Sequence, residues 1–169
     1  IERTQEQVQA KANGINAYEN KLLALDNQIH SLNDLQRLKI QTVDNKVKQS
    51  KLLVTTDSAG WKASEIELET ARQRLKRQED MYNQGLISLT DLETRRLKLQ
   101  ETKAKAIEQE NKYGLSVNKY INTLIEQDQV ISEFAEKISD VKSKRSSAGS
   151  ELYDGLGEMS KMKNQLANY

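Results

Sequence analysis

Side chains that commonly carry catalysis or bind metal ions are scarce in this chain. The single histidine, His30, has no second imidazole with which to share a metal ion, and cysteine is absent, which excludes disulfides and thiolate metal sites. Neighbouring carboxylates such as Glu65 and Glu69 have the spacing of ordinary solvated charges on one helix face. No group of residues has the pattern of a nucleophile with its base. We therefore predict no enzyme activity, no cofactor and no metal site.

The charge balance argues against a nucleic-acid partner. The chain has 26 lysine and arginine residues against 25 acidic ones, a net charge of +1. The most basic run, residues 72–77, is closely flanked by acidic residues. Glycines are scattered singly, so no phosphate-binding loop is expected.

Composition favours long helices over a compact globular core. Charged residues make up 30% of the 169 residues, proline is absent, and there is one tryptophan and one phenylalanine. Such a mixture is typical of coiled coils. Low mean hydropathy also fits disorder, but the regular spacing of the apolar residues weighs against it. The sequence contains no signal peptide, and no apolar run approaches the roughly 20 residues that a membrane-spanning helix needs.

Apolar residues recur every seven positions through both halves of the chain, which predicts two helices packed along one narrow stripe. The spacing slips after Leu32, because Gln36 stands where an apolar residue is due. In the first half the stripe comprises Ile1, Val8, Ile15, Tyr18, Leu22, Leu25, Ile29 and Leu32. In the second half it comprises Val117, Leu124, Ile131, Ile138, Leu152, Met159 and Leu166.

These patterns predict an all-α fold, a long antiparallel two-helix coiled-coil hairpin. The ascending arm is residues 1–84, the tip 85–90 and the descending arm 91–169. We expect breaks near 55–60 and 113–116, since Asp57, Ser58 and Ser116 are good N-cap residues and Gly60 and Gly114 are poor inside a helix. The alternative, a folded-back four-helix bundle, would normally use helices of similar length. Trp61, just past the first break, is expected to pack between the helices.

The tip has the residues of a tight helix-to-helix turn. Gly85 can adopt a left-handed conformation and end the first helix. Leu86 and Ile87 are expected to cover the end of the apolar stripe. Ser88 is a suitable N-cap for the second helix, and Thr90 is an equally suitable alternative.

The residues around the tip resemble a known family. Arg77, Met81 and Ser88 match the arginine–leucine–serine/threonine pattern at the hairpin tip of periplasmic adaptor proteins, also called membrane fusion proteins. The run 77–93 is similar to the tip of the HlyD-like type I secretion branch, and the resemblance covers about the last two-thirds of the chain. Met81 departs from the usual leucine but keeps its volume and apolarity.

The resemblance implies a structural role in protein export. In this family several adaptors, usually six, arrange their hairpins as a tube between an inner-membrane ABC transporter and a TolC-like outer-membrane channel. Arg77 would offer several donors to carbonyls or carboxylates, Met81 would fill an apolar groove, and Ser88 would form a hydrogen bond. Gly85 and Leu86 complete the expected partner-binding tip.

The same resemblance predicts the periplasm of a Gram-negative bacterium, with the parent protein anchored in the inner membrane. The chain would then be a piece of that parent, without its lipoyl-like, barrel and membrane segments. The alternative function is a generic coiled-coil scaffold that dimerises and binds partners along its sides. In that case Arg77 would be a solvated residue paired with Asp80 or Asp91.

Overall fold

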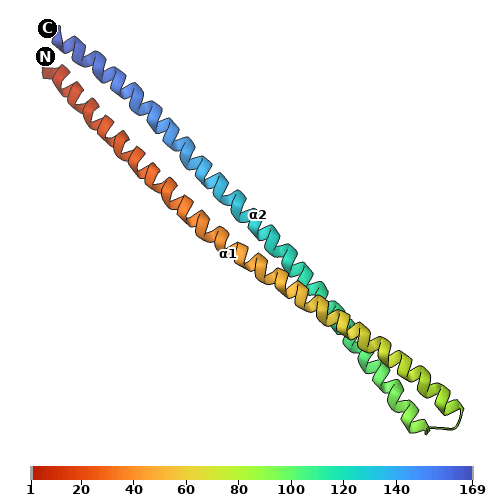
Figure 1. Ribbon diagram of the computed structural model, residues 1–169. Helices are drawn as coiled ribbons and strands as arrows, with labels where there is room; N and C mark the ends of the chain where they lie inside the picture. The colour runs from red at the N-terminus through yellow and green to blue at the C-terminus, as the bar shows by residue number, and fades with distance from the viewer. Residues whose placement is uncertain (1, 169) are drawn as a thin grey trace. The chain divides into compact units, whose positions relative to one another are not determined.

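The computed structural model describes residues 2–168, which form two helices and no strand. Helix α1 runs Glu2–Asn83 and helix α2 runs Leu89–Ala167. Figure 1 shows the two helices antiparallel, with a short turn after α1. The predicted all-α hairpin is confirmed, while Ile1 and Tyr169, the ends of the predicted arms, lie outside the described residues. Neither helix, over that range, has a stretch long and apolar enough to cross a bilayer.

The chain divides into two compact units. Unit 1 consists of Ile1–Gln41 and Asp128–Tyr169, and unit 2 is Thr42–Gln127. In each unit a segment of α1 packs against a segment of α2. We call the positions where the two helices face each other the seam.

The seam of unit 1 is mainly apolar. Leu25, Val141 and Ala148 form a buried cluster, against which Leu22, Ile29 and Leu32 pack. Elsewhere in unit 1, Ile15, Phe134 and Ile138 are also buried. The stripe predicted for the first half of the chain is therefore confirmed over the described residues of this unit.

The predicted slip in spacing after Leu32 is also present. Leu32, Gln36 and Ile40 are all half-buried at successive intervals of four residues, where three and four normally alternate. In α2, half-buried Val130 and buried Phe134 and Ile138 also follow one another at successive intervals of four residues, and Ile138 lines the same small cavity as Gln36. The two slips therefore lie level with each other.

The seam of unit 2 contains hydrogen-bonded polar pairs. Ser50 Oγ and Thr123 Oγ1 are 2.9 Å apart, and Ser116 Oγ donates a hydrogen bond to Asp57 Oδ2. Across the described residues, no buried side-chain nitrogen or oxygen lacks a hydrogen-bond partner. The buried polar residues are Ser50, Asp57, Ser64, Thr102, Ser116 and Thr123, interspersed with buried Val43, Leu68, Ala71, Leu92 and Ala106.

The breaks predicted near 55–60 and 113–116 are wrong, because both helices continue through these positions. Asp57 faces α2 in the seam and does not cap a helix end, and Ser116 is its partner. A Cβ added at Gly60 would lie 3.0 Å from Gln109 Oε1, so this glycine permits a close approach between the helices. Packing and hydrogen bonding within a long helix thus outweigh low intrinsic helix propensity. Without the breaks, the four-helix bundle alternative also fails.

An aromatic pair packs across the seam close to the predicted breaks, where both helices are continuous. The rings of Trp61 and Tyr113 stack with their centroids 5.4 Å apart and their planes 20° from parallel. Each ring comes from a different helix, which confirms the predicted position of Trp61 between the arms. A stacked pair of this kind adds to the buried apolar area at the centre of unit 2.

The stripe predicted for residues 117–131 is displaced in the structure. Ser116 and Thr123 are buried, whereas Val117 and Leu124 are half-buried and Ile131 is 43% exposed. At the first two positions the prediction chose the apolar residue of a neighbouring pair, but cross-helix hydrogen bonds place Ser116 and Thr123 inside. Beside Ile131, the half-buried neighbour is Val130. Later members of the same stripe, including Ile138, do face α1 as predicted.

Candidate partner-binding site at the turn

The turn after α1 has a well-defined backbone geometry. Gly85 has φ of 73°, the left-handed conformation that the sequence predicts. Its N–H donates to the Tyr82 carbonyl at 2.9 Å, and the Leu86 N–H donates to the Met81 carbonyl at 2.9 Å. These two bonds are those of a Schellman C-cap, which satisfies carbonyls at the helix end.

Ser88 begins the second helix. The Asp91 N–H donates to Ser88 Oγ at 3.1 Å, and α2 starts at Leu89. The prediction of Ser88 as N-cap is confirmed over the alternative, Thr90, and the helix starts two residues before the predicted descending arm. Asp91 in the first turn also places a negative charge at the positive end of the helix dipole.

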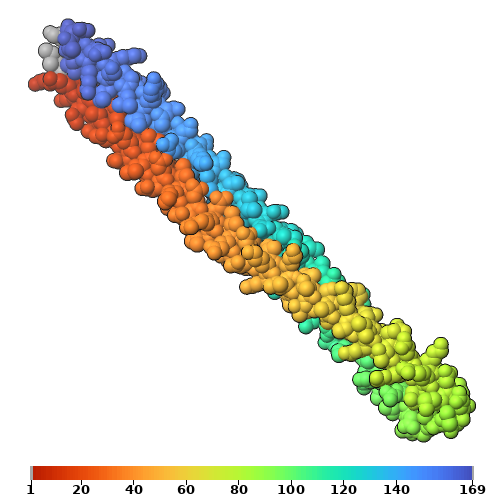
Figure 2. Space-filling view, viewed as in Figure 1, coloured from red at the N-terminus to blue at the C-terminus, as the bar shows by residue number. Residues whose placement is uncertain are grey.

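The turn presents apolar side chains to solvent. Leu86 is 64% exposed and Leu89 is 49% exposed, while Met81 and Tyr82 are each somewhat more than a third exposed. Leu86 was expected to cover the end of the apolar stripe, and this is wrong; Ile87 alone of the two is half-buried. Figure 2 shows this segment, in yellow-green, at one end of unit 2. Exposed apolar residues gathered at one turn are typical of a contact surface.

Arg77 is exposed and forms no ion pair or hydrogen bond with any described residue. The alternative in which it pairs with Asp80 or Asp91 is therefore absent from the structure. Its guanidinium is available to a ligand without first leaving an internal partner.

The structure brings Arg77 and Met81 together in one groove, of about 280 Å³, with a residue that the sequence analysis missed. Arg95 of α2 lines this groove, as do Arg74 and Gln78 of α1. Arg95 follows Leu92 by three residues and precedes Leu99 by four, so its spacing alone could have placed it in the seam. The predicted tip residues Gly85, Leu86 and Ser88 lie in the turn, outside this groove.

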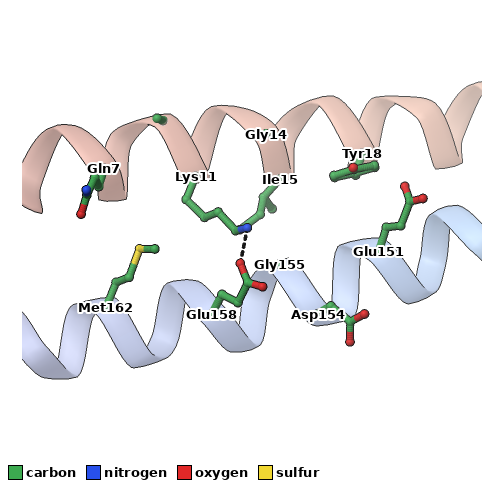
Figure 3. A pocket seen from close by; sticks show the side chains of 11 residues that line it. Gln7, Lys11, Gly14, Ile15, Tyr18, Glu151, Asp154, Gly155, Glu158 and Met162 are labelled. Atoms are coloured by element: carbon green, nitrogen blue, oxygen red, sulfur yellow. Dashed lines mark ion pairs between the residues drawn. The ribbon is translucent and has the colours of Figure 1, made fainter.

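A second cavity, of about 600 Å³, lies between the helices of unit 1 (Figure 3). Lys11 extends towards Glu158 and forms an ion pair with it. The hydrogen bond from Lys11, together with its charge, lowers the pKa of the Glu158 carboxyl. A Cβ added at Gly155 would lie 3.6 Å from Ile15, so the small residue lets the helices approach. These features account for the cavity as a packing groove with a paired charge at its rim.

The histidine and the carboxylates considered in the sequence analysis each contact a neighbouring side chain on the same helix. His30 is on an exposed face, with Nε2 3.6 Å from Asp34, and not beside the seam. Glu65 accepts a hydrogen bond from Trp61 Nε1 at 3.2 Å, and Glu69 accepts one from Gln73 at 3.5 Å. Within residues 2–168, no group of three or more histidine, cysteine, aspartate or glutamate side chains could hold a metal ion.

No family model and no curated protein sequence matches this chain. A functional interpretation therefore depends on the turn and the groove beside it, and on the resemblance of residues 77–93 to adaptor tips.

Proposed function

We propose that this chain is the hairpin of a periplasmic adaptor protein, which bridges an inner-membrane export pump and a TolC-like outer-membrane channel, with the turn docking on the channel. The observation that carries this proposal is the unpaired Arg77 beside exposed Met81, next to the turn of a two-helix hairpin. Their spacing to Ser88 is that of the adaptor tip pattern. The chain acts structurally in this role, without catalysis or cofactor.

Each tip residue has a part in docking that follows from its surroundings. Leu86, Met81 and Tyr82 would lose exposed apolar area to the partner, which favours association. Ser88 Oγ accepts the capping hydrogen bond from Asp91 and keeps its own hydrogen to donate outward. Gly85 sets the direction of the turn through its left-handed backbone.

Within this proposal, copies of the parent protein assemble side by side, as hexamers in the family that the tip resembles. The parent would contact the ABC transporter through parts outside this chain, anchored in the inner membrane of a Gram-negative bacterium. Absence of cysteine suits an oxidising periplasm. No nucleic acid takes part in this function.

A scaffold that binds partners along its sides is the second candidate. The observation in its favour is a set of large apolar residues exposed on unit 2 away from the turn, each between 46% and 69% exposed. They are Leu52, Ile66, Leu115, Ile121 and Ile125. Side-chain burial on another helix would remove this area from water.

Photo-crosslinking in cells that make the full-length parent would separate the two candidates. A crosslinking amino acid replaces Leu86, which is 64% exposed and caps α1 through its backbone N–H alone, and in a matched variant it replaces Leu52, which is 68% exposed on a side of unit 2. We expect the Leu86 variant to capture an outer-membrane channel, identified by mass spectrometry, and the Leu52 variant not to capture it. Channel capture by neither variant, with other proteins captured at Leu52, would favour the scaffold.

A further inference from the structure

Three arginines converge on the groove beside the turn. Arg74 and Arg77 come from α1 and Arg95 comes from α2, and all three line the groove with Gln78 and Met81. Arg74 and Arg95 also line the adjoining groove of about 400 Å³. Guanidinium groups repel one another, so an anion bound among them would relieve that repulsion.

None of these arginines has an acidic partner among residues 2–168. Among the carboxylates of α1, Glu69 lies 3.7 Å from Arg72 and Glu67 lies 3.1 Å from Lys105. Glu79 and Asp80 are closer in the sequence, but neither lines the groove or pairs with one of its arginines. The groove itself is lined by no acidic residue. The positive charge of the three arginines is therefore available to an anionic ligand in the groove.

Arg145 occupies a position in unit 1 that is comparable to that of Arg95, and it does have an acidic partner. Arg145, like Arg95, interrupts a run of seam residues, lying four residues after buried Val141 and three before buried Ala148. The Arg145 guanidinium pairs with Asp26 of the opposite helix. Arg145 thus has an acid facing it on the opposite helix, whereas Arg95 shares its groove with Gln78.

The charge of the surrounding sequence also favours an anionic ligand. Between residues 70 and 100 there are seven lysine and arginine residues and four acidic ones, an excess of three positive charges in a chain whose net charge is +1. The remainder of the chain is accordingly acidic on balance. A basic groove in such a chain attracts anionic groups selectively to this end of unit 2.

We propose that the groove formed by Arg74, Arg77 and Arg95 binds the carboxylates of an acidic surface segment of a protein partner. Each guanidinium presents paired N–H donors that match a carboxylate, and Met81 supplies an apolar contact beside them. This inference rests on the proposed function in treating the turn as a docking surface. It adds the chemistry that the partner must present.

An NMR titration of the whole chain tests the ligand class. The probe is a peptide of eight glutamates with blocked ends, and the matched control is the same peptide built from glutamine. We expect the Nε–Hε signals of Arg74, Arg77 and Arg95 to shift with the glutamate peptide alone, and the affinity to fall as salt rises from about 50 to 300 mM. Equal shifts with the glutamine peptide, or no shift of these signals, would overturn the proposal.

Charge-matched variants test the site. Arg95→Gln should weaken binding of the glutamate peptide about tenfold, because it removes a charge-assisted donor pair. Exposed Arg74→Gln gives a second variant outside the seam, expected to have a similar effect. Arg96→Gln removes the same charge at an exposed position that does not line the groove, and should change the affinity less than about twofold. Equal weakening by Arg96→Gln would mean that general attraction, and not this groove, binds the peptide.

The two tests fail separately. Crosslinking at Leu86 reports docking of the turn whether or not the groove binds carboxylates. Channel capture without peptide binding would reject the acidic ligand and leave the docking function in place. Peptide binding without channel capture would retain the groove and reject the proposed partner.

Discussion

The polar pair at the centre of unit 2 should respond asymmetrically to truncation. Ser116 Oγ donates to Asp57 Oδ2, and both residues are 4% exposed. The same hydroxyl also lies 3.1 Å from the Lys112 carbonyl, within hydrogen-bond distance. A hydroxyl has one hydrogen, so Ser116 has a second acceptor available if Asp57 is removed. Asp57 has no comparable second hydrogen-bond donor, because its other partner, the Lys112 ammonium, forms an ion pair with it at 3.7 Å, beyond hydrogen-bond distance.

The magnitudes follow from this difference. Ser116→Ala leaves a buried carboxylate without its donor, and hydrogen bonds to charged groups contribute about 1.5–3 kcal/mol, so we expect a loss of about 2 kcal/mol. Asp57→Ala removes the charge and its desolvation cost together, and alanine has the higher helix propensity, so the expected loss is about 1 kcal/mol or less. In the Asp57→Ala background, Ser116→Ala should then cost under about 0.5 kcal/mol.

Urea unfolding followed by circular dichroism at 222 nm measures these free energies of unfolding in the whole chain. The double-mutant cycle should give a coupling of about 1.5 kcal/mol between Asp57 and Ser116. Equal losses from the two single variants, or additive losses in the double variant, would refute the reasoning that the hydroxyl has a second acceptor and the carboxylate has no second donor.

Two further outcomes are expected from the contacts of single residues. Gly114→Ala should stabilise the protein by about 0.5–1 kcal/mol, because the added Cβ meets no atom within 4 Å inside a continuous helix. Gly85→Ala should destabilise the protein by about 1 kcal/mol, because φ is 73° there. Urea unfolding midpoints measure both effects, and a loss of stability in Gly114→Ala would contradict helix continuity at that position. Lys11→Met should raise the pKa of the Glu158 carboxyl, measured by NMR titration, because it removes the hydrogen bond and charge that lower it. Since the folded-state pKa is lowered, the contribution of this pair is present above the ordinary carboxyl pKa and is lost as pH falls through the lowered value; an unchanged titration would contradict the assignment.

Local rules were sufficient at the turn and in the first arm. A glycine in the left-handed region and a serine N-cap each depend on a few neighbouring residues, so Gly85 and Ser88 could be predicted from the sequence. The apolar stripe of the first arm could be predicted because large side chains such as Leu25 have no competitor for the seam. Even the slip at Gln36 could be read from spacing alone.

Residues that interact across the two helices could not be placed in the same way. Asp57 and Ser116 are ordinary capping residues by local preference, and only their partnership across the seam explains why they lie inside continuous helices. Val117 is half-buried and not at the centre of the seam, because the hydrogen bond to Asp57 places neighbouring Ser116 there. The basic groove could not be predicted from the sequence, because Arg95 and Arg77 are 18 positions apart. The absence of an acidic residue between them becomes apparent only when the two helices are paired.

The polar pairs of the seam have a consequence for the groove, because they fix which residues face each other near the turn. Apolar side chains pack nearly as well after a shift along a helix, but a donor and its acceptor must remain opposite. Ser50 faces Thr123, and seven residues closer to the turn Asp57 faces Ser116. Three further steps of seven residues in each helix bring Gln78 opposite Arg95, and both line the groove. Hydrogen bonds in the middle of unit 2 therefore set the register that leaves Arg95 facing an amide, and its positive charge free for a partner.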